Sequence, residues 1–375
     1  MNINRKTQTI TVACSLAGAL VLAAVGIGCY FGGRHSLVPP QTANGIVSYL
    51  SGDSKTYSST SEVVEAVADT VVEIRTETVT TQWGHQYIVS GAGSGVIVGS
   101  GGELSYIVTN NHVIAGANDI TVTTRAGESF AASLVATDDS ADIAVVTVAC
   151  DNLPVAVWGN SDDLKIGDDL IAIGNPLGSL GGTVTKGILS AAGRTISVGN
   201  FAMTLLQTDT AINPGNSGGG LFNMHGELIG VVNAKTTDEE IEGICFAIPA
   251  NTARAVYNDL VQYGYLVGRA TLNVEVAEGT INAGVNTQPQ TIVYVTAVKN
   301  AAEGTFMQYD RIDKINGATI SSVLELNAVL AKIKPGDSVE VTVFRGTLSQ
   351  GWMGNSLSFA SETTVFRITA AQYGA

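Results

Sequence analysis

The hydrophobic residues change their spacing sharply along the chain. Residues 11–31 form one uncharged apolar run, whereas the chain beyond residue 61 carries short runs rich in Val, Ile and Thr. Gly, Asn and Asp separate these short runs at intervals of about 10–20 residues, which is typical of an all-β fold. The expected strands of this part fall at 94–98, 106–114, 119–124, 142–148, 170–174 and 226–234.

The apolar run at 11–31 is long enough to cross a bilayer, because a helix of that length spans about 31 Å. Arg5 and Lys6 precede it, which favours a cytoplasmic N-terminus. A cleaved signal peptide is the competing interpretation, but its apolar core would be shorter, about 7–15 residues. A lipoprotein site at Cys29 is a weaker alternative. We therefore expect a cytoplasmic segment at 1–8 and a transmembrane anchor at 9–31, with the remaining chain outside the cytoplasm.

The remaining chain divides into a linker and two domains. Residues 32–60 contain a Pro-Pro pair, Ser and Gly without periodicity, which predicts a linker. Residues 251–263 place apolar side chains on one helical face between a proline and a glycine, so we expect a helix there. We set a domain boundary after it, giving domains at 61–263 and 264–375. The second domain has three further β-rich runs and one more expected helix at 323–333.

Composition narrows the class of protein. The chain has 375 residues, 45% hydrophobic and 14% charged, which excludes wholesale disorder. Its net charge of −14 argues against a nucleic-acid partner. The four Cys and four His show no metal-ligand spacing, so we expect neither a metal nor a cofactor. Cys150 and Cys245 could pair outside the cytoplasm, although free buried thiols fit their apolar surroundings better.

The most specific local signal is the GNSGG run at 215–219. Small residues around Ser217 would expose its hydroxyl on a tight turn. The backbone N–H groups of Gly215 and Ser217 could then hold an oxyanion. A glycine-rich hairpin turn without chemistry is the alternative.

A serine nucleophile needs a base and a group that orients the base. His112 follows a buried-looking strand, although a lone histidine in such a place is commonly structural. Asp142 leads directly into an apolar run, and bonding the His112 ring would satisfy its carboxylate. The alternative is a turn aspartate at a strand edge, for which Asp138 and Asp139 are more natural.

The order His–Asp–Ser with GNSGG last is that of the chymotrypsin fold. TNNHVI, SADIAVV, IAIGNPLG and QTDTAINPGNSGGGLFN closely resemble motifs of the HtrA/Deg family of trypsin-like serine proteases. The resemblance implies a mostly β fold: a double β-barrel protease domain, then an α+β PDZ domain, preceded here by the transmembrane helix. It also implies an acyl-enzyme mechanism with His112, Asp142 and Ser217, a homotrimer, and unfolded, damaged or regulatory proteins as substrates.

Regulation follows from the residue before the serine. Zymogen activation in chymotrypsin-like proteases pairs a new N-terminal amine with an aspartate there, but Asn216 carries no charge. Loop ordering must replace that ion pair. We expect the movable loops at Leu177–Thr185 and Ala191–Met203, with Arg194 contacting the PDZ domain or a neighbouring subunit. A solvated loop charge is the alternative for Arg194.

Substrate selection follows from two further places. Ala211, six residues before the serine, is expected at the floor of the S1 pocket, which disfavours Lys or Arg at P1 and favours small aliphatic residues. In the PDZ domain, Leu272, Asn273 and Val274 match the carboxylate-binding loop, with Asn273 where the family has Gly. We expect C-terminal peptides there. The competing functions are a silent PDZ scaffold and a chaperone-like holder of unfolded chains.

Overall fold

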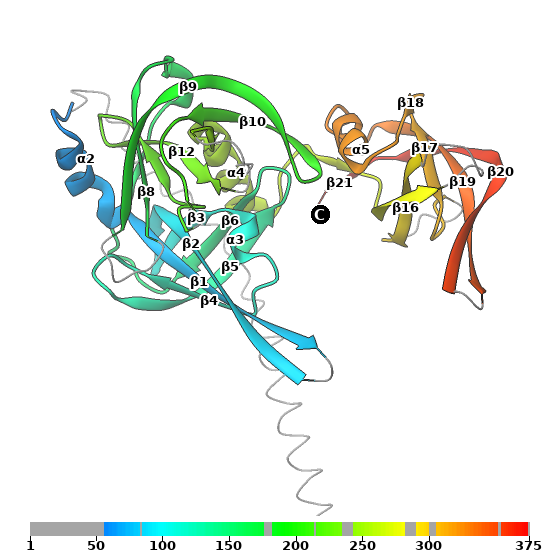
Figure 1. Cartoon of the computed structure of the whole chain (residues 1–375), viewed down its shortest axis with the longest axis horizontal. Helices are drawn as coiled ribbons and strands as arrows, with labels where there is room; N and C mark the ends of the chain where they lie inside the picture. The colour runs from blue at the N-terminus through cyan, green and yellow to red at the C-terminus, as the bar shows by residue number, and fades with distance from the viewer. Residues whose placement is uncertain are drawn as a thin grey trace, which may run out of the picture. The chain divides into compact units, whose positions relative to one another are not determined.

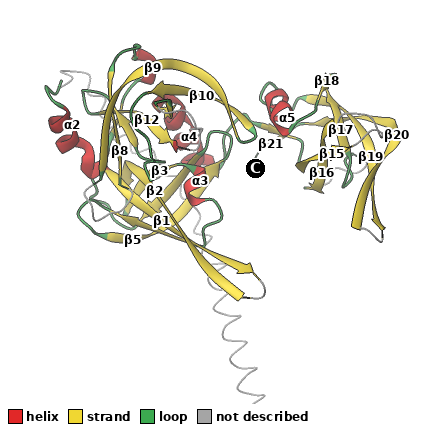
Figure 2. Ribbon diagram, in the orientation of Figure 1, coloured by secondary structure: helices red, strands yellow, loops and turns green. Residues whose placement is uncertain are grey.

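The structure is a computed structural model of the whole chain (Figures 1 and 2). All described residues belong to one compact unit, Ser51–Ala375. The expected anchor at 9–31 lies outside them, and no helix among the described residues is long and apolar enough to cross a membrane. The described residues are 56–82, 85–175, 182–213, 215–234, 243–281, 290–299, 305–351 and 354–373.

The first half of the protease region is a closed six-stranded antiparallel barrel. Its strands alternate between inward and outward side chains, and Val72, Ile97 and Val146 are among the buried residues inside. In barrel order the strands are β1 (Val71–Gln82), β2 (His85–Gly101), β3 (Leu104–Thr109), β6 (Ile143–Val148), β5 (Ser129–Asp138) and β4 (Asp119–Thr123).

The second half closes in the same way, because β11 pairs with both β8 and β12. A short strand, β7 (Val157–Trp158), adds to β12 in parallel. The double barrel expected from the resemblance is therefore present. The ring consists of β11 (Gly220–Phe222), β8 (Asp169–Gly174), β9 (Thr183–Val198), β10 (Phe201–Thr208), β13 (Cys245–Pro249) and β12 (Glu227–Asn233).

Short helices flank the barrels. Helix α2 (Thr60–Val67) is capped by Ser59, whose hydroxyl accepts the Glu62 N–H. The expected helix at 251–263 is α4 (Ala250–Tyr263), which ends where Gly264 takes a left-handed φ of 79°. Its buried face joins a core cluster that also contains side chains of both barrels, so α4 helps to hold the barrels together. The remaining short helices here are η1 (Ala68–Thr70), α3 (Asn111–Ile114) and η2 (Ser161–Asp163).

The C-terminal region folds around a sheet and one helix, α5 (Val323–Leu330), three residues shorter at its C-terminus than expected. Ile312, Val341 and Leu326 belong to its separate core. The sheet order is β15 (Val274–Ile281), β16 (Gln290–Val298), β17 (Arg311–Ile315), β19 (Ser338–Gly351) and β20 (Gly354–Thr369). β18 (Ala318–Thr319) pairs with β17, and β14 (Ala270–Thr271) pairs with β21 (Ala371–Gln372).

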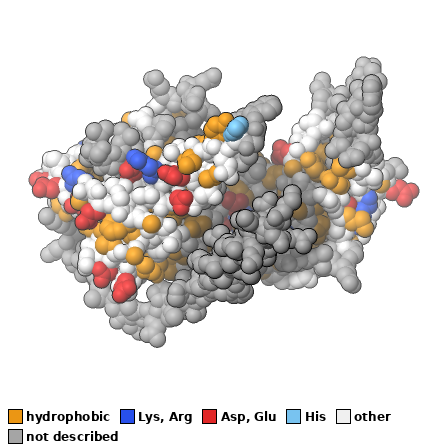
Figure 3. All heavy atoms as spheres, turned by 90° about the horizontal axis from the view of Figure 1, so that it is seen from below, with side chains coloured by type: hydrophobic (Ala, Val, Ile, Leu, Met, Phe, Trp, Pro, Cys, Tyr) orange, Lys and Arg blue, Asp and Glu red, His pale blue; other side chains and the backbone are white. Residues whose placement is uncertain are grey.

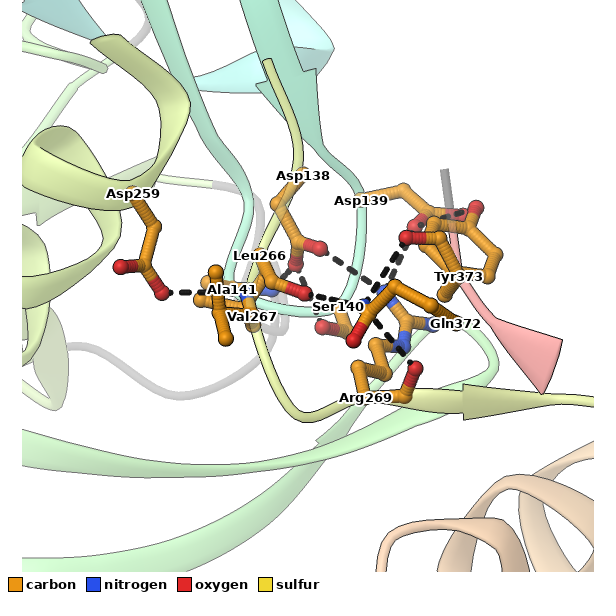
Figure 4. A network of polar contacts seen from close by, with 10 residues as sticks. All are labelled: Asp138, Asp139, Ser140, Ala141, Asp259, Leu266, Val267, Arg269, Gln372 and Tyr373. Atoms are coloured by element: carbon orange, nitrogen blue, oxygen red, sulfur yellow. Dashed lines mark hydrogen bonds and ion pairs between the residues drawn. The ribbon is translucent and has the colours of Figure 1, made fainter. Parts of the chain in front are cut away.

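A polar network joins the segment after α4 to the end of β5 (Figure 4). Arg269 donates to Asp138 at 2.9 Å and to Asp139 at 3.3 Å, and the Tyr373 hydroxyl also reaches Asp139 at 3.2 Å. The Arg269 guanidinium lies over the Tyr373 ring, 4.0 Å from its centroid. The network therefore connects the C-terminal region to the turn that leads from β5 to Asp142.

Two expectations about local structure are wrong. The run at 106–114 is a strand only as far as Thr109, after which Asn111–Ile114 form α3. The expected loop at Ala191–Met203 is instead a long hairpin of β9 and β10 that turns at Gly199 and Asn200. Its high content of small residues reflects tight strand pairing and a two-residue turn, not a long loop.

Candidate active site

His112 and Asp142 meet at one end of the first barrel. α3, directly after β3, carries His112, and the turn before β6 carries Asp142. The His112 Nδ1 lies 2.6 Å from Asp142 Oδ2, and the His112 backbone N–H donates to Asp142 Oδ1 at 2.9 Å. Since an ionised carboxylate can only accept, the ring proton belongs on Nδ1. The Nε2 lone pair is then free to act as a base.

Ser217 comes from the second barrel and completes the chain of contacts. Its Oγ lies 3.1 Å from His112 Nε2 and accepts the Ala234 N–H at 3.3 Å. The next residue, Gly218, has a φ of 82°, and a Cβ there would overlap the Ser94 carbonyl and the Thr109 hydroxyl. Only glycine therefore allows the turn to approach the first barrel so closely. The hydroxyl is held where the His112 base can take its proton.

Asn233 is a member of the site that the sequence analysis missed. At the end of β12 it is fully buried, and its side-chain amide donates to Asp142 Oδ2 at 3.0 Å. Asn110 donates to the Asp142 backbone carbonyl, also at 3.0 Å. Asp142 adopts a left-handed φ of 51°, so these bonds hold a conformation that a non-glycine residue rarely takes. A polar residue ending the apolar run ELIGVVN was the available signal.

The turn at 215–219 presents backbone donors beside Ser217. Gly215 has a φ of 102°, and Asn216 has its carbonyl held by the Gly219 N–H at 2.9 Å. Within the described residues, the N–H groups of Gly215 and Ser217 have no protein acceptor. Free N–H groups on a rigid turn are the arrangement that binds a developing oxyanion.

Comparison with known proteins agrees with this geometry. Residues 93–231 match the trypsin-like peptidase domain family, and residues 270–350 match the PDZ domain family. The solved structure of the HtrA-type protease AlgW with a tripeptide is 32% identical, with a TM-score of 0.53 and coverage of 84% of this chain and 98% of that one. The chain belongs to the HtrA family of trypsin-like serine proteases.

Curated HtrA relatives are longer than this chain. The serine protease Do-like HtrA of Bacillus subtilis (strain 168) is 38% identical over 275 residues, covering 68% of this chain and 61% of the relative. A probable periplasmic serine protease of Haemophilus influenzae, do/HhoA-like, is 41% identical over 267 residues, covering 68% of this chain and 56% of the relative. The chain thus spans less than two thirds of either.

The other expected site residues lie on β9 and in the segment before the serine turn. Arg194 lies on β9 and donates to Gln207 at 3.0 Å on its own hairpin. Among the described residues it makes no polar contact with the PDZ domain, and a contact with a neighbouring subunit stays a prediction. Two other contacts join the protease region to the C-terminal region. Arg269 donates to Asp138, and the Asn327 amide donates to the Asn200 carbonyl. Ala211 is exposed, and its carbonyl accepts from Thr185 at 2.8 Å.

The expected carboxylate loop leads into β15, an edge strand of the C-terminal sheet. Leu272 is buried, Val274 opens the strand, and Asn273 has a φ of 57°. Asparagine tolerates this left-handed conformation better than most residues, which explains how it can stand where the resemblance implies glycine.

The described part of the chain has two cysteines. Cys150 and Cys245 are both free thiols, and burial raises the pKa of Cys245. Across the described ranges, no cluster of three or more His, Cys, Asp or Glu could hold a metal ion.

Proposed function

We propose that this chain is a membrane-tethered, extracytoplasmic serine endopeptidase that cleaves unfolded, damaged or regulatory proteins. The observation that carries the proposal is the continuous contact from Asp142 through His112 to the Ser217 hydroxyl. The anchor at 9–31 would hold the enzyme at the membrane. Relatives described as periplasmic support an extracytoplasmic location.

In the first half-reaction, Ser217 Oγ attacks the scissile carbonyl carbon while its proton moves to His112 Nε2. The carbonyl oxygen becomes an oxyanion that accepts from the N–H groups of Gly215 and Ser217. Asp142 stabilises the imidazolium and keeps its ring oriented. His112 then protonates the leaving amine, the C–N bond breaks, and an ester at Ser217 remains. Water, deprotonated by His112, hydrolyses this ester and restores the serine.

Substrate selection is proposed to use two elements. Ala211 has no charge to pair with Lys or Arg, so small aliphatic residues are proposed at P1. The PDZ domain is proposed to bind C-terminal peptides as an extra strand on the free edge of β15, with Leu272, Asn273 and Val274 around the carboxylate. The catalytically silent scaffold is not favoured, since all three side chains of the triad are present and in contact.

The decisive test is casein cleavage by the full chain in lipid vesicles. We expect wild type to cleave, Ser217→Ala to be inactive, and Ser105→Ala, a buried serine away from the triad, to resemble wild type. A hydrophobic C-terminal peptide should raise the rate, and its C-terminally amidated form should not. Equal cleavage by wild type and Ser217→Ala would refute the triad assignment.

A further inference from the structure

Ser94, in the middle of β2, contacts the turn that carries the nucleophile through both its backbone and its side chain. It has an exposed fraction of 0%. Its backbone N–H donates to the Ser217 carbonyl at 2.8 Å, and its Oγ donates to the Gly215 carbonyl at 2.7 Å. The same Oγ accepts the Asn175 N–H at 2.8 Å. One serine of the first barrel therefore holds both carbonyls that flank Asn216 in the second.

These two bonds fix the directions of the neighbouring N–H groups. The C=O and N–H of a planar trans peptide point in opposite directions. The Gly215 carbonyl points to Ser94, and the Asn216 N–H on the far side of that peptide donates to Asn213 at 3.0 Å. The peptide after Ser217 is fixed in the same way, with its carbonyl on Ser94 and the Gly218 N–H on Val232 at 3.0 Å.

Between these two fixed peptides lies the one that supplies the Ser217 N–H. Its carbonyl, on Asn216, accepts from Gly219 at 2.9 Å, so its N–H must point away from that bond. On the N-terminal side of this peptide, the bond from Ser94 to the Gly215 carbonyl restricts rotation of the backbone between Gly215 and Asn216. The Ser217 N–H, one of the two proposed oxyanion donors, thus has an orientation that depends on the carbonyls Ser94 holds, and the Gly215 N–H lies on the same residue as one of them.

The backbone around Ser94 is built for this close approach. A Cβ on Gly93 would lie 2.6 Å from the Val113 side chain and 3.2 Å from the Ser217 carbonyl. Ser94 is itself held within the first barrel, because its carbonyl accepts the Thr109 hydroxyl at 2.7 Å. The backbone of Ser94 is therefore held close to the turn that carries Ser217.

We infer that Ser94 is a positioning residue for peptide hydrolysis, which sets the oxyanion turn from across the barrel interface. The inference rests on the proposed function and goes beyond its triad. Without the hydroxyl, the Gly215 carbonyl and the Asn175 N–H lose their partner in a buried place, and the turn is free to rotate out of its catalytic conformation. Because the oxyanion forms only in the transition state, the loss should fall on kcat and leave KM nearly unchanged.

The test compares full-length wild type with Ser94→Ala and Ser105→Ala. Ser105 is a matched control, since it is also fully buried in the first barrel and its hydroxyl donates to a backbone carbonyl, that of Cys150, at 2.6 Å. We expect Ser94→Ala to lower kcat for casein by about 100-fold, the effect of displacing a catalytic group by roughly 1 Å. The rate of fluorophosphonate labelling at Ser217 should fall in parallel, while Ser105→Ala should keep both rates.

Ser94→Cys provides a second variant, because its thiol keeps an atom and a weak donor at the γ position. We expect it to recover part of kcat. A folded Ser94→Ala or Ser94→Cys protein that is labelled as fast as Ser105→Ala would overturn the inference, as would a loss confined to KM. Failure of the proposed function is distinguishable, since wild type itself would then show no cleavage and no labelling.

Discussion

Asn233 donates to the same carboxylate oxygen of Asp142 that the His112 ring contacts. The oxygen lies 3.0 Å from the Asn233 amide and 2.6 Å from the ring nitrogen. The two donors arrive from different barrels, because Asn233 ends β12 and His112 follows β3. The orientation of the carboxylate is therefore a joint property of both barrels.

Removing the Asn233 amide should lower activity while the nucleophile stays in place. A hydrogen bond to a charged group contributes about 1.5–3 kcal/mol, so we expect Asn233→Ala to reduce kcat/KM roughly 10- to 100-fold. Asn152→Ala is the control, since its amide donates to Asp151 at 2.7 Å at an exposed position. Equal casein cleavage by the two variants would contradict a role for Asn233.

Loss of the Arg269 guanidinium should destabilise the protein more than loss of a surface ion pair. Asp138 is only 1% exposed, so Arg269→Met leaves a buried carboxylate without its charge partner. We expect a loss of about 1–3 kcal/mol in the free energy of unfolding. Lys186→Met removes the ion pair with Asp169, whose two side chains are 42% and 46% exposed. Its loss should lower the free energy of unfolding by at most about 1 kcal/mol. Urea denaturation of both variants measures the difference, and equal losses would argue against the buried pair.

Asp310 should make the C-terminal region less stable as the pH rises. Burial raises the pKa of Asp310, although the Met307 N–H and the Arg345 guanidinium act to lower it. The folded protein thus holds the proton more tightly than the unfolded chain, where an aspartate pKa is about 3.9. The resulting stabilisation is complete below that pH and is lost as pH rises through the folded pKa.

Comparison with Asp310→Asn, which cannot titrate there, isolates this effect. The free energy of unfolding of wild type minus that of the variant should fall as pH increases above about 4. Hydrogen exchange of the β17 amides in urea, measured at several pH values, follows the region concerned. A constant or rising difference would show that the burial effect has been assigned the wrong sign.

The backbone at Tyr309 should store conformational strain. Its φ of 72° is left-handed, which costs a non-glycine residue roughly 1–2 kcal/mol. We expect Tyr309→Gly to stabilise the C-terminal region by about 1 kcal/mol. In contrast, Gly346→Ala should destabilise it by about 1–3 kcal/mol, because its Cβ would overlap the Tyr309 carbonyl. Thermal unfolding tests both changes, and a lower midpoint for Tyr309→Gly would mean that lost side-chain contacts outweigh the strain.

Much of the fold could be predicted because its signals are local. α4 has its apolar stripe between Pro249 and Gly264, and the apolar strands of the barrels lie between turn residues. His112, Asp142 and Ser217 could be selected because a hydrolase needs those three chemistries in a known order.

Ser94 has no such local signal, and the polar end of the run ELIGVVN is only a weak one for Asn233. Ser94 and Asn233 act on groups 121 and 91 positions away in the chain, so only the closed barrels bring them to the site. The prediction of a loop at Ala191–Met203 was wrong for the opposite reason, since a composition typical of a loop also suits a long hairpin with a tight turn. Arg269 has its partners about 130 positions earlier, which no periodicity indicates.

Because the triad is divided between two barrels, catalysis requires that the two barrels stay packed together. His112 and Asp142 belong to one barrel and Ser217 to the other, so any parting of the barrels breaks the contact between base and nucleophile. Separation of the two barrels would therefore abolish catalysis even if each barrel kept its strands paired. If the proposed function holds, a partly unfolded copy would be inactive as a protease and could not cleave other proteins without control.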